Sequence, residues 1–321
     1  VLIAIVSGLM AAAGRLSVGT ISSFLLYSRQ FTRPFVDIAN IYNNFQTAVA
    51  GAERIFEILD EQTEPEDRPG ALPLVRPVGE IRLDHVTFGY REDKPVLKDV
   101  SLYIPAGTKV AVAGPTGAGK TTLINLLTRF YDVQEGAILL DGHDLRDYRM
   151  ADLRAAFGVV LQDTALFGES IRDNIGYGRK NVSFEKIKEA AVRAGADAFI
   201  RRLPQGYDTV LTQGGAELSQ GERQLLTIAR ALLSDAPILI LDEATSSVDT
   251  VTEQHIRRAM DAAAKGRTSF LIAHRLSTIR DCDLILLIED GRMAEQGSHG
   301  ELMRLEGSYA RMYRTQMGEA G

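Results

Sequence analysis

Residues 114–122, GPTGAGKTT, have the composition and spacing of a loop that binds phosphate groups. The pattern G-x-x-x-x-G-K-[ST] is satisfied by Gly114, Gly119, Lys120 and Thr121. In such a loop the glycines let the backbone wrap around phosphate oxygens, Lys120 supplies positive charge for the β and γ phosphates, and Thr121 is a ligand for Mg²⁺. The remaining positions are Pro115, Thr116, Gly117, Ala118 and Thr122. The alternative is a chance glycine-rich turn, but the apolar KVAVA before the loop and the helical pattern after it favour a nucleotide phosphate site.

Two adjacent carboxylates, Asp242 and Glu243, follow the apolar run ILIL at 238–241. The carboxyl end of a buried strand is where α/β sheets bind ligands. Asp242 is suited to the ligand shell of Mg²⁺, and Glu243 is suited to polarising an attacking water. An ordinary acidic exit from a strand is the alternative. The pair therefore predicts a site where a phosphate group is hydrolysed, with Asp242 near Mg²⁺ and Glu243 near the attacking water.

A second anion site is predicted at LSQGERQ, residues 218–224. Ser219 and Glu222 form the S-x-x-E capping-box pattern, and Gly221 keeps the first turn uncrowded. The start of a helix presents free N–H groups and a positive dipole end, both of which attract anions. One nucleotide does not obviously need two such sites in the same chain.

The elements that must position these residues alternate between apolar strands and helices. VAVA at 110–113, ILIL at 238–241, FLIA at 270–273 and LILLI at 284–288 are apolar on both faces, which is typical of strands buried in a parallel sheet. An earlier strand is expected around Ile81–Phe88. Residues 80–321 are therefore predicted to form an α/β domain.

The first 59 residues have a different character. Residues 1–14 carry no charge and residues 16–28 add a second uncharged run, yet neither run reaches the ~20 residues that span a bilayer. An apolar seam with a seven-residue period follows at Phe24, Phe31, Ile38 and Phe45, which predicts a long helix from about Ser17 to Leu59 with Pro34 as a possible kink. Two interpretations stay open: the end of a membrane span followed by a helix that projects from the membrane, or a soluble coiled-coil arm. Residues 60–79 are rich in proline and acidic residues and are expected to be a linker.

Composition narrows the class of partner. The 321 residues exceed one typical domain, and the net charge of −6 argues against a nucleic-acid binder that works by neutralising phosphates. Cys282 is the only cysteine, which excludes an internal disulfide and suits a reducing, cytosolic setting for the α/β domain. The first residue is Val1 rather than Met, so a fragment lacking its N-terminal part is expected.

The motifs GPTGAGKTT, LSQGERQ, ILILDEATSSVD and IAHRLST occur in the order found in the ATPase domain of ABC transporters, which residues 80–318 resemble. Residues 14–61 resemble the last transmembrane helix of ABC exporters and its connection to the nucleotide domain. The resemblance implies a P-loop α/β fold with a mostly parallel sheet core, an antiparallel β subdomain and an α-helical subdomain, preceded by transmembrane helices. It implies three segments: 1–59, the end of the transmembrane domain; 60–79, the linker; and 80–321, the nucleotide-binding domain.

The resemblance also assigns roles to single positions. Tyr90 matches the aromatic residue that stacks on adenine, and Gln162 matches the glutamine that touches Mg²⁺ or water and relays the nucleotide state. His274 matches the histidine that contacts the γ-phosphate, and Asp249 lies in the loop that crosses between paired domains. Because two such domains pair head to tail, Ser219 and Gly221 of one chain would grip the ATP held by the other. The motif LSQGERQ differs from the commonest form in this family, LSGGQRQ, because Gln220 replaces a glycine and Glu222 replaces a glutamine. Just before it, Gln213 and Gly214 occupy positions where Glu and Arg are frequent.

The implied function is the ATP-binding and ATP-hydrolysing subunit of an exporter that uses ATP and Mg²⁺. Its expected partners are a second half-transporter subunit, identical or different, the membrane, and a small hydrophobic or amphipathic substrate, with no nucleic acid. Its expected location is the cell membrane, with several spans and the nucleotide-binding domain in the cytoplasm. A lipid or peptide exporter, a soluble ATPase of the same family acting on DNA or ribosomes, and an unrelated P-loop switch are the alternatives; the long N-terminal helix and the pair Glu243 and His274 favour the exporter.

Overall fold

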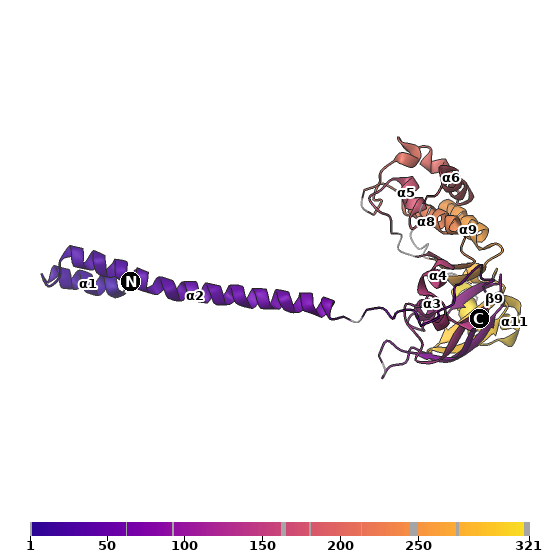
Figure 1. Ribbon diagram of the computed structural model, residues 1–321, viewed down its shortest axis with the longest axis horizontal. Helices are drawn as coiled ribbons and strands as arrows, with labels where there is room; N and C mark the ends of the chain where they lie inside the picture. Colours follow the sequence, from indigo (N-terminus) through magenta and orange to yellow (C-terminus); the bar gives the residue numbers. More distant parts are fainter. Residues whose placement is uncertain are drawn as a thin grey trace. The chain divides into compact units, whose positions relative to one another are not determined.

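The computed structural model describes residues 2–61, 63–91, 93–161, 165–179, 181–212, 214–243, 250–273 and 276–317 (Figure 1). The chain divides into two compact units, Val1–Glu66 and Asp67–Gly321. The division falls inside the stretch predicted to be a linker. Residues that follow it belong to the second unit: the Met150 N–H donates to the Asp67 carboxylate at 2.8 Å, and Leu72 pairs with Tyr148.

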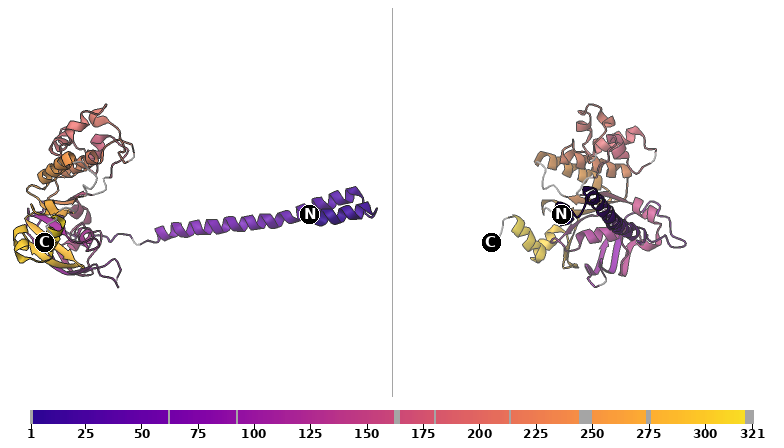
Figure 2. Two further views of the ribbon diagram at one scale, coloured as in Figure 1. Left: turned by 180° about the vertical axis from the view of Figure 1, so that it is seen from behind. Right: turned by 90° about the vertical axis from the view of Figure 1, so that its left-hand side faces the viewer.

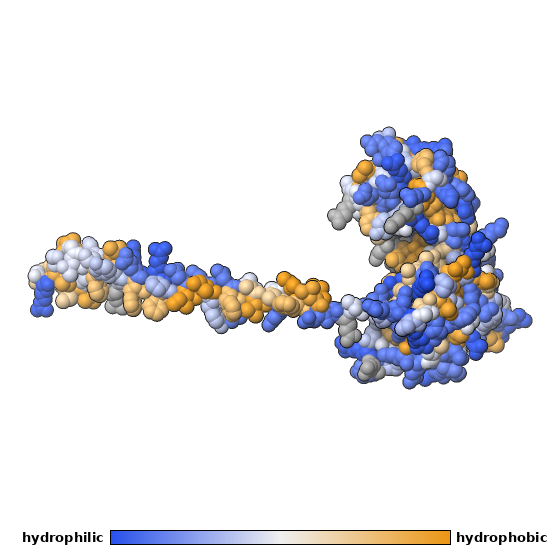
Figure 3. All heavy atoms as spheres, in the orientation of Figure 1, coloured by the Kyte–Doolittle hydropathy of each residue, from blue (hydrophilic) through white to orange (hydrophobic). Residues whose placement is uncertain are grey.

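The described part of the first unit contains two helices, α1 (Leu2–Ala12) and α2 (Val18–Leu59). Ser17 begins α2, because its side chain accepts a hydrogen bond from the Thr20 N–H. The long helix predicted from the sequence is thus confirmed, and Pro34 lies inside it without ending it. No residue of α2 is buried, and Figure 3 shows apolar side chains along much of its length. Among the described residues, no helix combines the length and the apolar character that crossing a membrane requires.

A six-stranded sheet forms the centre of the second unit, within the described residues, in the order β10-β9-β3-β8-β7-β6. All neighbours run parallel except β9 and β10, which are antiparallel. Its strands are β3 (Lys109–Ala113), β6 (Phe157–Val160), β7 (Ile238–Glu243), β8 (Thr268–Ala273), β9 (Leu284–Glu289) and β10 (Arg292–Gly297). The mostly parallel sheet predicted from the four apolar runs is confirmed.

Both faces of this sheet are buried, and alternate residues of each strand contribute to different apolar clusters. Val110 and Val112 of β3 belong to the cluster shared with the smaller sheet and α3, whereas Ala111 and Ala113 belong to the cluster shared with the helices. β7 repeats this alternation, with Ile238 and Ile240 on one side and Leu239 and Leu241 on the other. Because side chains alternate across a strand, a run that is apolar at every position can supply two cores at once.

A smaller sheet of four antiparallel strands covers one side, in the order β2-β1-β4-β5. Its strands are β1 (Ile81–Phe88), β2 (Leu97–Ile104), β4 (Glu135–Leu140) and β5 (His143–Asp144). β1 pairs with both β2 and β4 and ends two residues before Tyr90. This sheet therefore places the segment carrying Tyr90 at its edge.

Helices make up the rest of the second unit, and those from α5 to α9 gather together on one side of it in both views of Figure 2. The α-helices are α3 (Lys120–Leu127), α4 (Met150–Ala155), α5 (Ile171–Gly176), α6 (Phe184–Arg193), α7 (Asp197–Ile200), α8 (Gln220–Ser234), α9 (Thr250–Ala264), α10 (Leu276–Ile279), α11 (His299–Leu305) and α12 (Ser308–Met317). Short 3₁₀ turns occur at Leu145–Asp147 and Gly206–Asp208. α8 is the central member of the helical group, since it packs against α5, α6, α9 and β6.

Candidate functional site

The predicted phosphate loop connects β3 to α3, as the sequence pattern requires. Gly114 has a φ of 145°, and a Cβ there would lie 2.1 Å from the carbonyl oxygen of Ile288. Gly119 has a φ of 109°, and a Cβ there would lie 2.7 Å from the Leu97 side chain. Glycine is therefore needed at both positions, for conformation and for space. The loop is held closely against the neighbouring strands β9 and β2.

The ammonium group of Lys120 lies over this loop. Its Nζ donates hydrogen bonds to the carbonyl oxygens of Gly114 at 2.8 Å and Pro115 at 2.9 Å. Burial lowers the pKa of Lys120 from its ordinary value, and the nearby Asp242 carboxylate acts in the opposite direction. A poorly hydrated ammonium group attracts a phosphate oxygen more strongly than one in bulk water, because the local dielectric constant is lower.

The first unit contains a pocket of about 410 Å³, and the second contains one of about 460 Å³. The second adjoins the phosphate loop, and its polar and apolar parts are mixed. It is lined by Tyr90, Val96, Thr116, Gly117, Gly119, Lys120, Thr121, Thr122, Asp242 and Ile272. Eight predicted site residues from three separate stretches of sequence thus meet in one cavity. Its volume lies in the range of small-molecule sites.

Tyr90 stands at the edge of this pocket with about half of its surface exposed. Its ring meets the rings of Phe88 and Tyr131 edge to face, at centroid distances of 5.3 and 5.1 Å. Its hydroxyl lies 3.3 Å from the Thr122 Oγ1 and accepts a hydrogen bond from the Asn125 Nδ2 at 3.1 Å. One face of an aromatic ring is a suitable surface for a planar base.

The strand order brings the ends of several predicted motifs to one edge of the sheet. β7 ends with Asp242 and Glu243, which pair in parallel with Ile272 and Ala273 of β8. β8 ends immediately before His274, and the neighbouring β6 ends two residues before Gln162. Gln162, Asp249 and His274 themselves lie outside the described residues, as does the side chain of Glu243. Their assignment remains a prediction.

The residues present fit a magnesium ion bound together with a nucleotide. The Thr121 hydroxyl and the Asp242 carboxylate line the same pocket and offer hard oxygen ligands. Mg²⁺ in nucleotide sites typically takes one or two protein oxygens and completes its shell with phosphate and water oxygens. Two oxygen donors next to a phosphate loop are therefore a sufficient protein contribution.

The predicted anion site at the start of α8 is a complete capping box. The Glu222 N–H donates to the Ser219 Oγ, and the Ser219 N–H donates to the Glu222 carboxylate at 2.9 Å. Ser219 is exposed and Gly221 is buried. Neither residue lines the pocket beside the phosphate loop. The single chain therefore has two separate candidate phosphate sites.

Sequence reasoning missed several residues around the pocket. Val96 and Ile272 line it, and Asn125 and Tyr131 contact Tyr90. Ile272 is the first residue of the motif IAHRLST, but no role is predicted for it there, and the other three residues belong to no motif. The hydrogen bond between Asn125 and Tyr90 joins residues 35 positions apart, and no spacing in the sequence indicates it.

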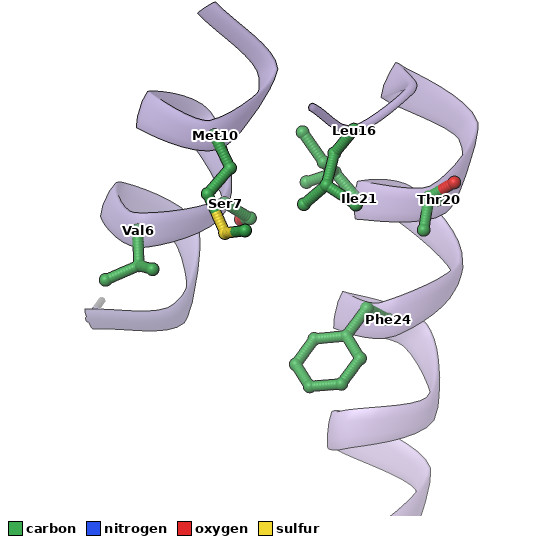
Figure 4. A pocket seen from close by; sticks show the side chains of 7 residues that line it. All are labelled: Val6, Ser7, Met10, Leu16, Thr20, Ile21 and Phe24. Atoms are coloured by element: carbon green, nitrogen blue, oxygen red, sulfur yellow. The ribbon is translucent and has the colours of Figure 1, made fainter. Parts of the chain in front are cut away.

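The pocket of the first unit lies between α1 and α2 and is almost entirely apolar. Figure 4 shows Met10 of α1 and Phe24 of α2 turned toward the space between the two helices. Ser7 and Thr20 are the polar members of the lining. None of the seven residues that line it is charged, so this pocket is a different kind of site from the one in the second unit.

Comparison with known proteins agrees with this geometry. The family described as ABC transporter matches residues 97–246. The uncharacterized ABC transporter ATP-binding protein YfiC of Bacillus subtilis (strain 168) is 50% identical over 315 residues, which cover 98% of this chain and 52% of that protein. A fatty acid ABC transporter ATP-binding/permease protein of Mycobacterium bovis is 48% identical over 314 residues, covering 98% and 49%. The solved structure of a bacterial Atm1-family ABC exporter with ATP bound has a TM-score of 0.78 at 44% identity, covering 96% of this chain and 54% of that one.

This chain spans about half the length of the curated relatives it matches. The family match includes the phosphate loop, the start of α8 and the end of β7, and the structural likeness extends over nearly the whole chain. The sheets and helices of the second unit have the α/β fold of an ABC ATPase domain. On this evidence residues 97–246 belong to the ABC transporter family, and the chain as a whole is similar to ABC transporter proteins.

Proposed function

We propose that this chain is the ATP-binding and ATP-hydrolysing part of an ABC exporter. The observation that carries the proposal is the single pocket lined by Tyr90, the phosphate loop and Asp242. An aromatic surface, a positively charged loop and a carboxylate correspond to the base, the phosphates and the metal of Mg·ATP. The solved exporter that this chain resembles contains bound ATP, which supports the same ligand here.

In this proposal each residue has a separate role. Tyr90 stacks on adenine, Lys120 neutralises the β and γ phosphates, and Thr121 and Asp242 hold Mg²⁺. When bound, the metal ion neutralises charge that develops on the transferred phosphoryl group. Glu243 accepts a proton from the attacking water, and His274 contacts the γ-phosphate. Gln162 reports on the nucleotide from the end of β6, and Asp249 lies where paired domains cross.

Two chains are needed to complete each site. The start of α8 offers a second set of phosphate-binding groups in the same chain, and one ATP has no use for both sets. We assign Ser219 and Gly221 to the ATP held by a partner, which is either an identical chain or a related half-transporter subunit. Hydrolysis then requires association of two nucleotide-binding domains.

We assign the N-terminal part of the chain to the membrane. The relatives are about twice as long as this chain, and one of them is named as both ATP-binding protein and permease. We assign residues 1–59 to the end of a multi-pass membrane domain, residues 60–79 to the linker and residues 80–321 to a nucleotide-binding domain in the cytoplasm. The apolar side chains of α1 and α2 support a hydrophobic or amphipathic cargo, such as a lipid.

The test is ATP-driven association of the full chain carrying Glu243→Gln. Loss of the base should slow hydrolysis by ~10²- to 10⁴-fold while ATP stays bound. Light scattering should then show a dimer with ATP and Mg²⁺ but not with ADP, and this comparison corrects for association through the apolar helices. Adding Ser219→Arg should dissociate the dimer. A Glu243→Gln protein whose size does not depend on ATP would contradict the shared site.

A further inference from the structure

Tyr90 is held at its ring, at its hydroxyl and at the backbone before it, by residues from separate segments of the chain. Its ring is held edge to face by Phe88 and Tyr131, with interplanar angles of 83° and 85°. Phe88 is almost fully buried, so the Tyr90 ring rests against the core through this contact. Edge-to-face packing of this kind restricts the tilt of a ring. Other residues hold the hydroxyl of Tyr90 and the backbone of the residue before it.

The hydroxyl end is attached to α3. Asn125 donates from Nδ2 to the Tyr90 hydroxyl at 3.1 Å, and Thr122 lies 3.3 Å away. Both residues follow Lys120 and Thr121 on the same short helix. The helix that begins at the phosphate loop therefore also holds the aromatic ring.

The backbone is held from the other side by Gln134. Its Oε1 accepts a hydrogen bond from the Gly89 N–H at 2.8 Å, and its Nε2 donates to the Gly89 carbonyl oxygen at 3.1 Å. A Cβ at Gly89 would lie 2.4 Å from the Lys94 carbonyl oxygen, so the turn is also tightly packed. The residue that precedes Tyr90 is thus bound at both of its backbone polar groups.

We infer that Asn125 and Gln134 are positioning residues that hold Tyr90 ready to receive the nucleobase. This inference rests on the proposed role of Tyr90. Without these residues, the half-exposed ring must lose conformational freedom when the base binds, and that entropy is subtracted from affinity. With them, the ring is already placed relative to Lys120.

Asn125 acts through the Tyr90 hydroxyl, and this gives a direct test by double-mutant cycle. Asn125→Leu in the full chain should weaken ATP binding by about fivefold, the effect of one net hydrogen bond. In a Tyr90→Phe background, which lacks the hydroxyl, Asn125→Leu should weaken binding no further. Gln134→Leu acts through the backbone and should weaken binding in both backgrounds. In Tyr90→Ala neither variant should have an additional effect.

Inorganic tripolyphosphate is the matched probe, because it has the phosphates of ATP but no base. Its affinity should not change in Asn125→Leu or Gln134→Leu, whereas general damage to α3 or to the loop would weaken both ligands. Additive effects of Asn125→Leu and Tyr90→Phe, or equal losses for ATP and tripolyphosphate, would overturn the inference. If Tyr90→Ala itself leaves ATP affinity unchanged, the proposed role of Tyr90 fails. If Tyr90→Ala weakens binding and Asn125→Leu does not, only the positioning inference fails.

Discussion

The hydroxyl oxygen of Ser219 lies 2.8 Å from a carboxylate oxygen of Glu222, and the same carboxylate oxygen accepts the Ser219 N–H at 2.9 Å. The hydroxyl and N–H of Ser219, proposed to bind the phosphate of a partner's ATP, are thus already bonded to a negative charge within the chain. A second capping box, formed by Ser298 and Glu301 at the start of α11, has the same geometry with distances of 2.8 Å for both contacts. It provides a natural comparison.

Glu222→Gln should strengthen ATP-driven association. Glutamine can still accept the Ser219 N–H and so keep the capping box, but the negative charge is removed. Repulsion between two charges a few ångströms apart near a protein surface is about 1–2 kcal/mol, so the ATP concentration for half-maximal association should fall roughly tenfold. The measurement is light scattering against ATP concentration in the Glu243→Gln protein.

Glu301→Gln is the control, because it makes the same change in the same motif far along the chain. It should leave the ATP dependence unchanged. The difference between wild type and Glu222→Gln in the ATP concentration for half-maximal association should also shrink as salt is added, because salt screens exposed charges. A Glu222→Gln protein that associates less readily than wild type would show that the carboxylate assists the site.

Lys120→Ala should reduce ATP turnover by at least ~10²-fold, because a preorganised charge next to developing phosphate charge is lost. The fold should remain, since the Nζ contacts only two loop carbonyl groups. Lys109→Ala is a suitable control: Lys109 is at the start of the same β3 strand and pairs with Asp261 at 2.7 Å. That variant should lose up to ~1 kcal/mol of stability and keep its turnover. Steady-state phosphate release measures both, and unchanged hydrolysis in Lys120→Ala would reject the loop assignment.

Gly114→Ala and Gly117→Ala should differ strongly although they lie three residues apart. A Cβ at Gly114 would meet the Ile288 carbonyl oxygen, whereas a Cβ at Gly117 would have no atom within 4 Å. Gly117 has a φ of 83°, so alanine there costs conformational strain alone, about 1–2 kcal/mol. Gly114→Ala adds a backbone clash and should cost ~3 kcal/mol or more. Urea unfolding followed by circular dichroism distinguishes the two; equal losses would contradict the packing described for the loop.

Local requirements explain what the sequence predicts well. The loop from Gly114 to Thr122 needs particular residue types at fixed spacing, so its place between β3 and α3 could be predicted. The runs that became β3, β7, β8 and β9 are apolar at every position because both faces of the sheet are covered. The capping box at Ser219 depends only on residues three positions apart and could be predicted for the same reason.

Contacts between distant segments could not be predicted in this way. Asn125 and Gln134 meet the segment around Tyr90 only because β1 pairs with β4 and packs over α3. Nothing in their spacing indicates this. Residues 67–72 also lack any regular pattern, yet Leu72 pairs with Tyr148, which lies 76 positions away in the chain. Pairing of this kind depends on the whole fold.

The pH dependence of stability should contain opposite contributions from two histidines. The Nδ1 atom of His299 lies 2.8 Å from the hydroxyl oxygen of the buried Tyr309. Burial is the main cause that lowers the pKa of His299, and the positive charge of the nearby Arg280 lowers it further. A lowered pKa in the folded state means that the unfolded chain binds the proton more readily. The contribution of His299 is therefore present above about pH 6.5 and is lost as the pH falls through its lowered value. His85 is the opposite case, because its hydrogen bond to Asp99 raises its pKa.

Replacing each histidine with glutamine separates the two contributions. Between pH 7.5 and pH 5.5 the melting temperature of His299→Gln should fall less than that of wild type, because the variant has no proton to gain at this position. The melting temperature of His85→Gln should fall more than that of wild type over the same interval, because the stabilising proton on the exposed pair with Asp99 is missing. The effect of His85 should be the smaller one and should fade with added salt, since His85 and Asp99 are both exposed. If the His299→Gln curve runs parallel to wild type, the site around Tyr309 does not favour the neutral imidazole.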